Sequence, residues 1–229
     1  MTTLKVLSYN VLSLRLGMAE VAAVIRAVDP DVVCVQEAPR FYRSRRHCRA
    51  LAAASDLVVV TGGRPAGAVL LLARPGLRVV ERCSVKLPWH PPKHRRGVAL
   101  GVFDVGGTEV AVASTHLSLF EHERVDQAKR VLALLERTGR PAVLGGDINE
   151  DPDGPAFSLL GERLRDTYLA APFGDGLTST AAEPRRRIDA VFADAQCVVL
   201  RGEAVSIPGT GKASDHLPVL AVVDVPTVT

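Results

Sequence analysis

Residues 98–114, VALGVFDVGGTEVAVAS, contain two apolar runs joined by Gly106-Gly107. Short valine-rich runs are typical of buried strands, and a glycine pair between two such runs is a strong hairpin signal. The hairpin belongs to a longer series of strands with no helix between them, which we expect at 57–61, 68–73, 77–85, 98–105 and 109–114. This series excludes a strict alternation of strands and helices.

Helical periodicity is found on both sides of this series. Helices are expected over 18–28, 40–54, 121–137 and 156–160, the third with an apolar stripe that includes Val131 and Leu135. Further strands are expected at 4–9, 32–35, 142–144, 188–193, 197–205 and 219–223, and exposed loops at 86–96 and 172–187. The order predicts an α/β (α+β) fold, with two mixed sheets packed face to face and helices outside.

The composition restricts the class of protein. The 229 residues, without a linker or a change in composition, are expected to form one domain over 1–229. The four cysteines show no C-x-x-C spacing, which does not favour a zinc site or a disulfide framework. No apolar run approaches the roughly 20 residues of a membrane span, so we expect a cytoplasmic location. No protein partner is implied, and we expect a monomer.

The net charge of +3 does not by itself imply a nucleic-acid partner, but the basic residues are grouped. One group follows residue 39, a second ends the 86–96 loop, and a third precedes Ile188. A solvated face is the simplest interpretation of the first group, whereas the third is a candidate for contact with substrate phosphate, above all at Arg187. The groups are Arg40, Arg43, Arg45, Arg46 and Arg49; Lys93, Arg95 and Arg96; and Arg185, Arg186 and Arg187.

Six short segments place polar residues beside apolar runs. If they meet at one edge of a sheet, carboxylates, amides and imidazoles share one cleft, which suits binding of a hard divalent cation and cleavage of a phosphate ester. The segments are Ser8-Tyr9-Asn10, Gln36-Glu37, Thr115-His116-Leu117, Gly145-Gly146-Asp147-Ile148-Asn149, Arg187-Ile188-Asp189 and Ser214-Asp215-His216.

Each motif also has a structural alternative. Glu37 suits Mg²⁺, or it begins a helix where the dipole favours a carboxylate. The side chains of Asp147 and Asn149 point to the same side of an extended chain and suit a nucleophilic water and a phosphate oxygen, or they form an Asx turn. His216, with its tautomer fixed by Asp189, suits acid–base chemistry, although structural hydrogen bonds explain most single histidines, His116 included.

Taken together and in this order, the motifs resemble those of the endonuclease/exonuclease/phosphatase superfamily. That superfamily includes pancreatic-type deoxyribonuclease, abasic-site endonucleases, inositol polyphosphate 5-phosphatases and bacterial sphingomyelinases. Arg124 and Gln127 also fit its usual helix after the Thr-His-Leu motif. The matching segments are Ser8-Tyr9-Asn10, Val35-Gln36-Glu37, Thr115-His116-Leu117, Gly146-Asp147-Ile148-Asn149, Arg187-Ile188-Asp189 and Ser214-Asp215-His216-Leu217-Pro218.

The resemblance implies a four-layered sandwich with the site at one end of the two sheets, and it assigns roles. The implied cofactor is Mg²⁺ or Mn²⁺, and the implied metal ligands are Glu37, Asn10 and Asp215. Asp147, Asp189, His116 and His216 are the implied catalytic residues. Asn149 and Asn10 are implied to contact the substrate, with Arg187 as the further candidate named above.

Two departures from the family pattern bear on the substrate. Leu12 stands where abasic-site endonucleases usually carry a second carboxylate, and Glu81 is a weak match to the strand glutamate that pairs with the first histidine in deoxyribonucleases. We therefore expect a metal-dependent phosphoesterase acting on phosphodiesters, with nucleic acid (DNA or RNA) as the first choice of substrate. The alternatives are a phosphatase or phosphodiesterase for small molecules or lipid head groups, and a family scaffold without this activity.

Overall fold

The computed structural model describes residues 2–89 and 94–226 and contains two mixed β-sheets. In hydrogen-bonded order, the seven-stranded sheet contains β10 (Pro172–Phe173), β12 (Val198–Ala204), β13 (Val219–Val225), β1 (Thr2–Asn10), β2 (Val32–Gln36), β4 (Val69–Ala73) and β3 (Val58–Gly63). The six-stranded sheet contains β5 (Arg78–Lys86), β6 (Gly97–Val105), β7 (Thr108–His116), β8 (Ala142–Asp147), β11 (Asp189–Ala193) and β9 (Arg165–Asp166).

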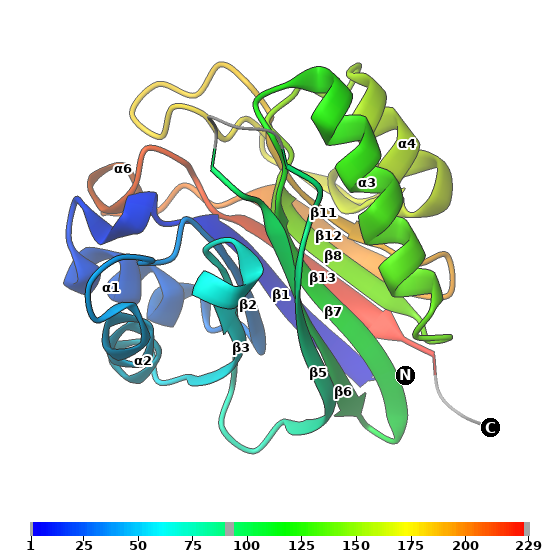
Figure 1. Ribbon diagram of the computed structural model, residues 1–229, viewed down its shortest axis with the longest axis horizontal. Coiled ribbons are helices and arrows are strands. Elements are labelled where there is room, and N and C mark those ends of the chain that lie inside the picture. The colour runs from blue at the N-terminus through cyan, green and yellow to red at the C-terminus, as the bar shows by residue number, and fades with distance from the viewer. Residues whose placement is uncertain (1, 90–93, 227–229) are drawn as a thin grey trace.

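Helices lie on the outer faces of the two sheets, as the apolar periodicity predicts. In Figure 1, α1 (Met18–Val28) and α2 (Ser44–Ala54) lie on one side of the paired sheets, and α3 (Glu121–Glu136) and α4 (Pro155–Arg163) lie on the other. Short helices complete the chain: η1 (Leu12–Leu14), η2 (Arg64–Ala66), α5 (Thr167–Ala170) and α6 (Thr210–Ala213). None of the helices in the described ranges combines the length and the apolar character that a membrane span requires.

Three apolar clusters hold the layers together. The central cluster lies between the sheets and joins Val6 and Leu71 of one sheet to Phe103 of the other. A second cluster packs the seven-stranded sheet against α1 and α2, and a third packs the six-stranded sheet against α3 and α4. All five residues of β2 and all five of β4 are buried, because both faces of their sheet are covered. The four-layered sandwich expected from the sequence is confirmed.

Strand register brings the polar segments to one edge. β7 and β8 are parallel with His116 opposite Asp147, and β11 is antiparallel to β8 with Asp189 opposite the same Asp147. In the other sheet, β1 and β2 are parallel and end together, and β13 is antiparallel to β1 and begins at that same end. The six segments therefore come from ends of strands that lie on the same side of the molecule.

Some sequence expectations need correction. The helix expected over 40–54 begins only at Ser44, because Arg43 takes a left-handed conformation with a φ of 53°. The side chains of Phe41 and Tyr42 before it are 75% and 77% exposed. The expected loop 172–187 contains β10 and the buried Thr178. The 86–96 segment begins as the end of β5, and its His90 and Lys93 lie outside the described residues.

Candidate active site

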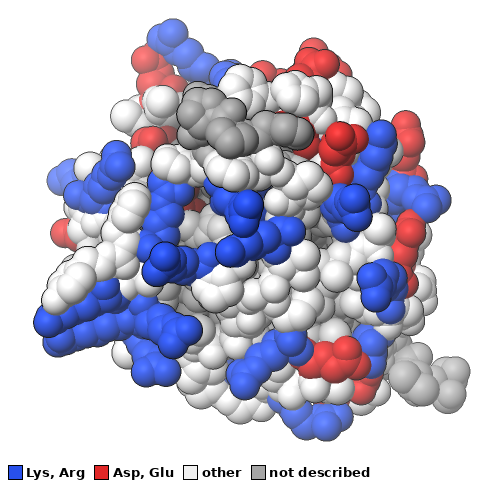
Figure 2. Space-filling view, in the orientation of Figure 1, with Lys and Arg blue, Asp and Glu red and all other residues white. Residues whose placement is uncertain are grey.

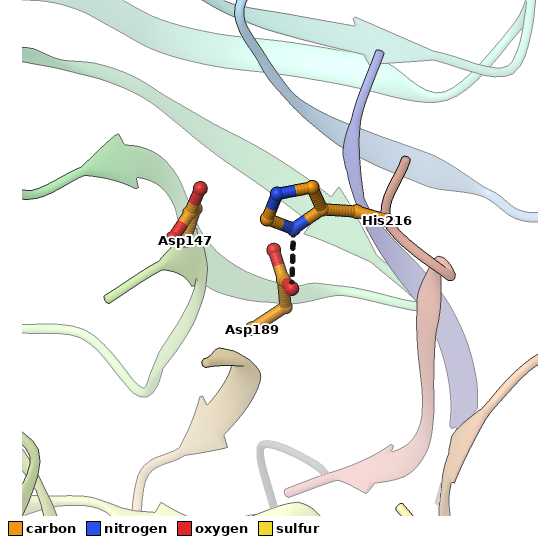
Figure 3. Close-up of side chains that lie close together, drawn as sticks. All are labelled: Asp147, Asp189 and His216. Carbon is orange, nitrogen blue, oxygen red and sulfur yellow. Dashed lines mark hydrogen bonds and ion pairs between the residues drawn. The ribbon is translucent and has the colours of Figure 1, made fainter. Parts of the chain in front are cut away.

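His216 and Asp189 form a closely held pair. The imidazole Nδ1 lies 2.8 Å from Asp189 Oδ2, and Figure 3 shows the ring directed at this carboxylate with Asp147 beside it. Burial alone would lower the pKa of His216, but the charges of Asp189 and Asp147 and the hydrogen bond from Asp189 raise it to about 10. The ring is therefore cationic near neutral pH, and its Nε2 makes no hydrogen bond to the described residues.

Asp147 receives two hydrogen bonds at the end of β8 and lies close to His116. Asn10 Nδ2 donates to Oδ2 over 2.9 Å, and the backbone N–H of Asn149 donates to Oδ1 over 3.0 Å. His116 Nε2 lies 3.2 Å from Oδ2. Burial and the nearby charge of Asp189 raise the pKa of Asp147 to about 7. A carboxylate with that pKa can accept a proton near neutral pH, which suits a general base.

His116 is buried and differs from His216 in its charge. Burial, together with the positive charges of Arg96 and His216, holds its pKa well below the usual range. The imidazole is therefore neutral near pH 7, and its Nε2 faces the Asp147 carboxylate. Glu81, the weak sequence candidate for its partner, instead forms an ion pair with Arg140 at 2.7 Å. Asp147 takes the place of the strand glutamate as the carboxylate beside this histidine.

Asn149 is fixed by the backbone around it. Its φ is 60°, and its Nδ2 donates to the carbonyl of Leu117 over 2.9 Å. This bond ties the end of β8 to the loop after β7. The side-chain oxygen and the second amide hydrogen of Asn149 are not used by the described residues, so they are available to a ligand.

Glu37 lies directly after β2 with a left-handed φ of 52°. Its carboxylate makes no hydrogen bond or ion pair within the described ranges, although its charge acts on Arg96. Arg96 is a site residue that sequence reasoning placed only in a basic group. Burial lowers the pKa of its guanidinium, while the charges of Asp147 and Glu37 oppose that shift. The signal in the sequence was only an arginine in a loop.

Asp215 and Arg187 make no hydrogen bond to these residues, although the charge of Asp215 helps to raise the pKa of His216. The side chain of Asp215 is exposed, and Ser214 beside it donates to the carbonyl of Asn10 over 2.6 Å. Arg187 is buried, and its two terminal nitrogens donate hydrogen bonds to the Asp166 carboxylate over 3.1 and 2.6 Å. Its guanidinium also lies over the rings of Phe157 and Tyr168. This geometry favours a structural role for Arg187 over the phosphate contact expected from the sequence.

The helix that begins after the Thr-His-Leu motif supports the site from behind. Arg124 Nε pairs with the buried Glu150 at 2.7 Å, and Gln127 Oε1 accepts the backbone N–H of Ser118 over 2.9 Å. Glu150 directly follows Asn149, so α3 anchors both the end of β8 and the loop after β7. Arg124 and Gln127 are thus positioning residues within the fold.

The donor set fits a hard divalent cation. Ligand atoms of Asp147, Asp189 and His216 lie within 4.8 Å of one another, and the two carboxylates are the donors, since the imidazole is protonated. Asp189 Oδ1 is buried without a hydrogen-bond partner in the described part of the chain. The half-buried Glu37 lies directly after β2. Oxygen donors with unused lone pairs are what Mg²⁺ and Mn²⁺ require, and a cation near them would offset the clustered negative charge.

Comparison with known proteins identifies the class. The Endonuclease/Exonuclease/phosphatase family profile matches residues 7–216. No curated protein sequence matches the chain significantly. A Bacteroides vulgatus endonuclease/exonuclease/phosphatase structure superposes with a TM-score of 0.84 at 20% identity, covering 99% of this chain and 100% of that one.

Two further solved structures are similar. A Bacteroides thetaiotaomicron mannosyl-6-phosphatase gives a TM-score of 0.82 at 20% identity, covering 96% of this chain and 99% of that one. An endonuclease/exonuclease/phosphatase from Beutenbergia cavernae gives a TM-score of 0.73 at 27% identity, covering 98% of this chain and 72% of that one.

The fold and the site define a phosphoesterase, a hydrolase of phosphate ester bonds. The chain belongs to the Endonuclease/Exonuclease/phosphatase family, whose members generally depend on a divalent metal.

Proposed function

We propose that the protein hydrolyses phosphodiester bonds with the help of Mg²⁺ or Mn²⁺, and that nucleic acid is its preferred class of substrate. The observation that carries the proposal is a carboxylate and an imidazole that lie close together and both have a raised pKa. The pKa of Asp147 is raised to about 7 and that of His216 to about 10, so a proton acceptor faces a fixed cation. Strongly shifted pKa values in neighbouring groups are typical of functional sites.

The proposed roles follow from the contacts. Asp147 orients a water and takes its proton as the water oxygen bonds to phosphorus and the bond to the leaving oxygen breaks. His216, held by Asp189, presents Nε2–H to a phosphoryl oxygen and stabilises its growing negative charge. Asn149 offers its free amide hydrogen to the same phosphate. Glu37 and Asn10 would hold the cation, with Asp215 the more exposed candidate, and the bound cation supplies charge neutralisation.

The test is the turnover of bis-p-nitrophenyl phosphate with Mg²⁺ or Mn²⁺. Asp147→Asn and His216→Ala should each lower kcat by about 10²–10⁴-fold, the usual loss on removing an acid–base group. Asp126→Asn, an exposed carboxylate on α3, is the control and should retain activity. Unchanged kcat in both site variants would contradict the assignment, and a protein that binds neither metal would favour a scaffold without this activity.

A second candidate function is a phosphatase on small phosphate monoesters. The similarity to the mannosyl-6-phosphatase favours it, because the two chains match over nearly their full lengths. Comparing oligonucleotides with sugar and inositol phosphates under the same conditions distinguishes the two by kcat/KM. The cytoplasmic location and the monomeric state expected from the sequence stay predictions.

A further inference from the structure

A basic groove runs beside the site, with a volume of about 1430 Å³. Its walls come from the loop before α2, from η2, from the end of β5 and from residues 94–95. Figure 2 shows Lys and Arg side chains spread over this face, with most acidic side chains toward its rim. No Asp or Glu is among the described lining residues, whereas six cationic side chains are: Arg40, Arg43, Arg45, Arg64, Lys86 and Arg95.

These cations lack the partners that arginines elsewhere have. None of the six forms an ion pair within residues 2–89 and 94–226, whereas Arg74, Arg78 and Arg140 are each paired with an aspartate or glutamate. Like charges gathered in one groove repel one another, and an anionic ligand relieves that repulsion. The groove is therefore built for negative charge that the chain itself does not supply.

Two aromatic rings also line the groove. Phe41 and Tyr42 are 75% and 77% exposed, in a chain with only ten aromatic residues. The guanidinium of Arg40 lies 5.1 Å from the Phe41 ring centre, and that of Arg43 lies 4.9 Å from the Tyr42 ring centre. Exposed rings interleaved with arginines are the pattern that binds single-stranded nucleic acid, by stacking on bases and pairing with phosphates.

The groove lies close to the site. Arg40 follows Glu37 by three residues, and its charge, like that of Arg96, acts on His116. Arg96 in turn follows Arg95 of the groove and acts on Asp147. The backbone N–H of Ala38 donates to Ala68, a lining residue, over 2.8 Å. A chain whose phosphate lies at Asp147 can therefore continue into the groove.

We infer that this groove binds a single-stranded nucleic-acid segment adjoining the scissile phosphate. The six cations contact successive phosphates, and Phe41 and Tyr42 stack on unpaired bases. A duplex keeps its bases stacked on one another and offers the rings no face, so single strands bind better. The inference rests on the proposed phosphoesterase function only for the position of the cleaved bond. A lipid surface fits less well, because the rings line a concavity between cations.

The test measures binding apart from cleavage. Fluorescence anisotropy in EDTA follows the full-length protein with a labelled single-stranded oligonucleotide and with its duplex. The double substitution Phe41→Ala, Tyr42→Ala should raise the single-strand Kd by at least about tenfold, since each base–aromatic stack is worth about 1–3 kcal/mol. Arg43→Ala, Arg45→Ala should reduce the slope of log Kd against log salt by about 1.4.

Matched controls separate the groove from general effects. Phe173→Ala removes another exposed ring beneath a guanidinium, that of Arg201, at the opposite edge of the seven-stranded sheet. Lys129→Ala removes an exposed charge from α3. Both controls should retain the wild-type single-strand Kd. All groove variants should keep wild-type turnover of bis-p-nitrophenyl phosphate, which does not reach the groove.

Several outcomes would overturn the inference. The first is an unchanged single-strand Kd in the aromatic variant. The second is a groove variant that loses single-strand and duplex binding equally. The third is a groove variant that loses binding to vesicles of anionic phospholipid while its oligonucleotide binding stays intact. If the wild-type protein does not hydrolyse bis-p-nitrophenyl phosphate, the proposed function fails, while the anisotropy still decides whether the groove binds single strands.

Discussion

At the scale of single residues, the site depends on the concentration of charge around Asp189. This carboxylate lies opposite Asp147 in the strand register and bonds to His216, while its Oδ1 has no partner among the described residues. Two buried carboxylates so close together repel each other, which raises the pKa of one of them and stabilises a cation beside them. A cationic His216 is thus part of what allows the folded chain to hold both aspartates.

The stability of the metal-free protein should therefore depend on pH through this pair. The pKa of His216 is about 10 in the folded state, against roughly 6.5 in the unfolded chain. The interaction of His216 with Asp189 should contribute fully to the free energy of unfolding below about pH 6.5. This contribution should disappear as the pH rises through about 10. Urea unfolding of the wild type and of His216→Ala, at a series of pH values in EDTA, should give free energies that converge over this window. The free energy of unfolding of Asp189→Asn should depend on pH as that of His216→Ala does. If the wild-type and variant free energies run parallel over the whole pH range, the expectation is contradicted.

At the scale of elements, β8 organises the site because it pairs with β7 on one side and β11 on the other. One residue, Asp147, thereby meets His116 and Asp189 directly across the ladder. A slip of one residue in either pairing would turn these side chains to the opposite face. The buried contacts of Arg187 with Asp166 fasten the segment that leads into β11, so they help to fix this register.

Arg187 should accordingly contribute to stability more than to binding. Arg187→Ala should lower the free energy of unfolding by about 3–5 kcal/mol, because it leaves the buried Asp166 carboxylate without its partner. The KM for bis-p-nitrophenyl phosphate should stay unchanged at a temperature where the variant is folded. Its neighbour Arg186 forms an exposed pair with Asp151, so Arg186→Ala should cost only about 0–1 kcal/mol. A raised KM with normal stability would restore the substrate role expected from the sequence.

The sequence predicts elements well where burial is continuous and poorly where local geometry decides. Strands such as β2 and β4 are uninterrupted apolar runs, and α3 has a clear apolar stripe. The predicted start of α2 at residue 40 is wrong, because the left-handed backbone of Arg43 interrupts a pattern that is helical in the sequence. The strands β9 and β10 have two residues each, too few for any periodicity. Arg96 was missed as a site residue because a loop arginine carries no pattern.

At the scale of the whole molecule, both sheets share the cluster that contains Leu71 and Phe103. Neither sheet can separate without exposing this buried surface to water, which is the reason to expect a single cooperative unit over the described residues. The site lies at one end of the same sheets, with side chains from both: Asn10 comes from one and Asp147 from the other. Binding of a cation at this junction should therefore stabilise the entire fold.

Thermal unfolding should show one transition, and addition of Mg²⁺ or Mn²⁺ should raise its midpoint. A ligand that binds only the folded state adds about 2.7 kcal/mol at a concentration 100 times its Kd. Glu37→Gln should abolish most of the upward shift while leaving the midpoint in EDTA close to that of the wild type. Scanning calorimetry with and without each metal measures both effects. Two separate transitions would contradict the single unit, and an unaltered shift in Glu37→Gln would exclude this carboxylate as a ligand.

The antiparallel pairing of β1 with β13, from Thr2 opposite Val225 to Ser8 opposite Val219, also has a consequence during protein synthesis. A nascent chain holds β1 paired only with β2 until residues 219–225 leave the ribosome, so the middle of the seven-stranded sheet presents an open edge throughout translation. His216 emerges just before that closing strand. Incomplete chains therefore lack both the closed sheet and the imidazole. We expect them to be prone to aggregation and, under the proposed roles, inactive until translation of this region is finished.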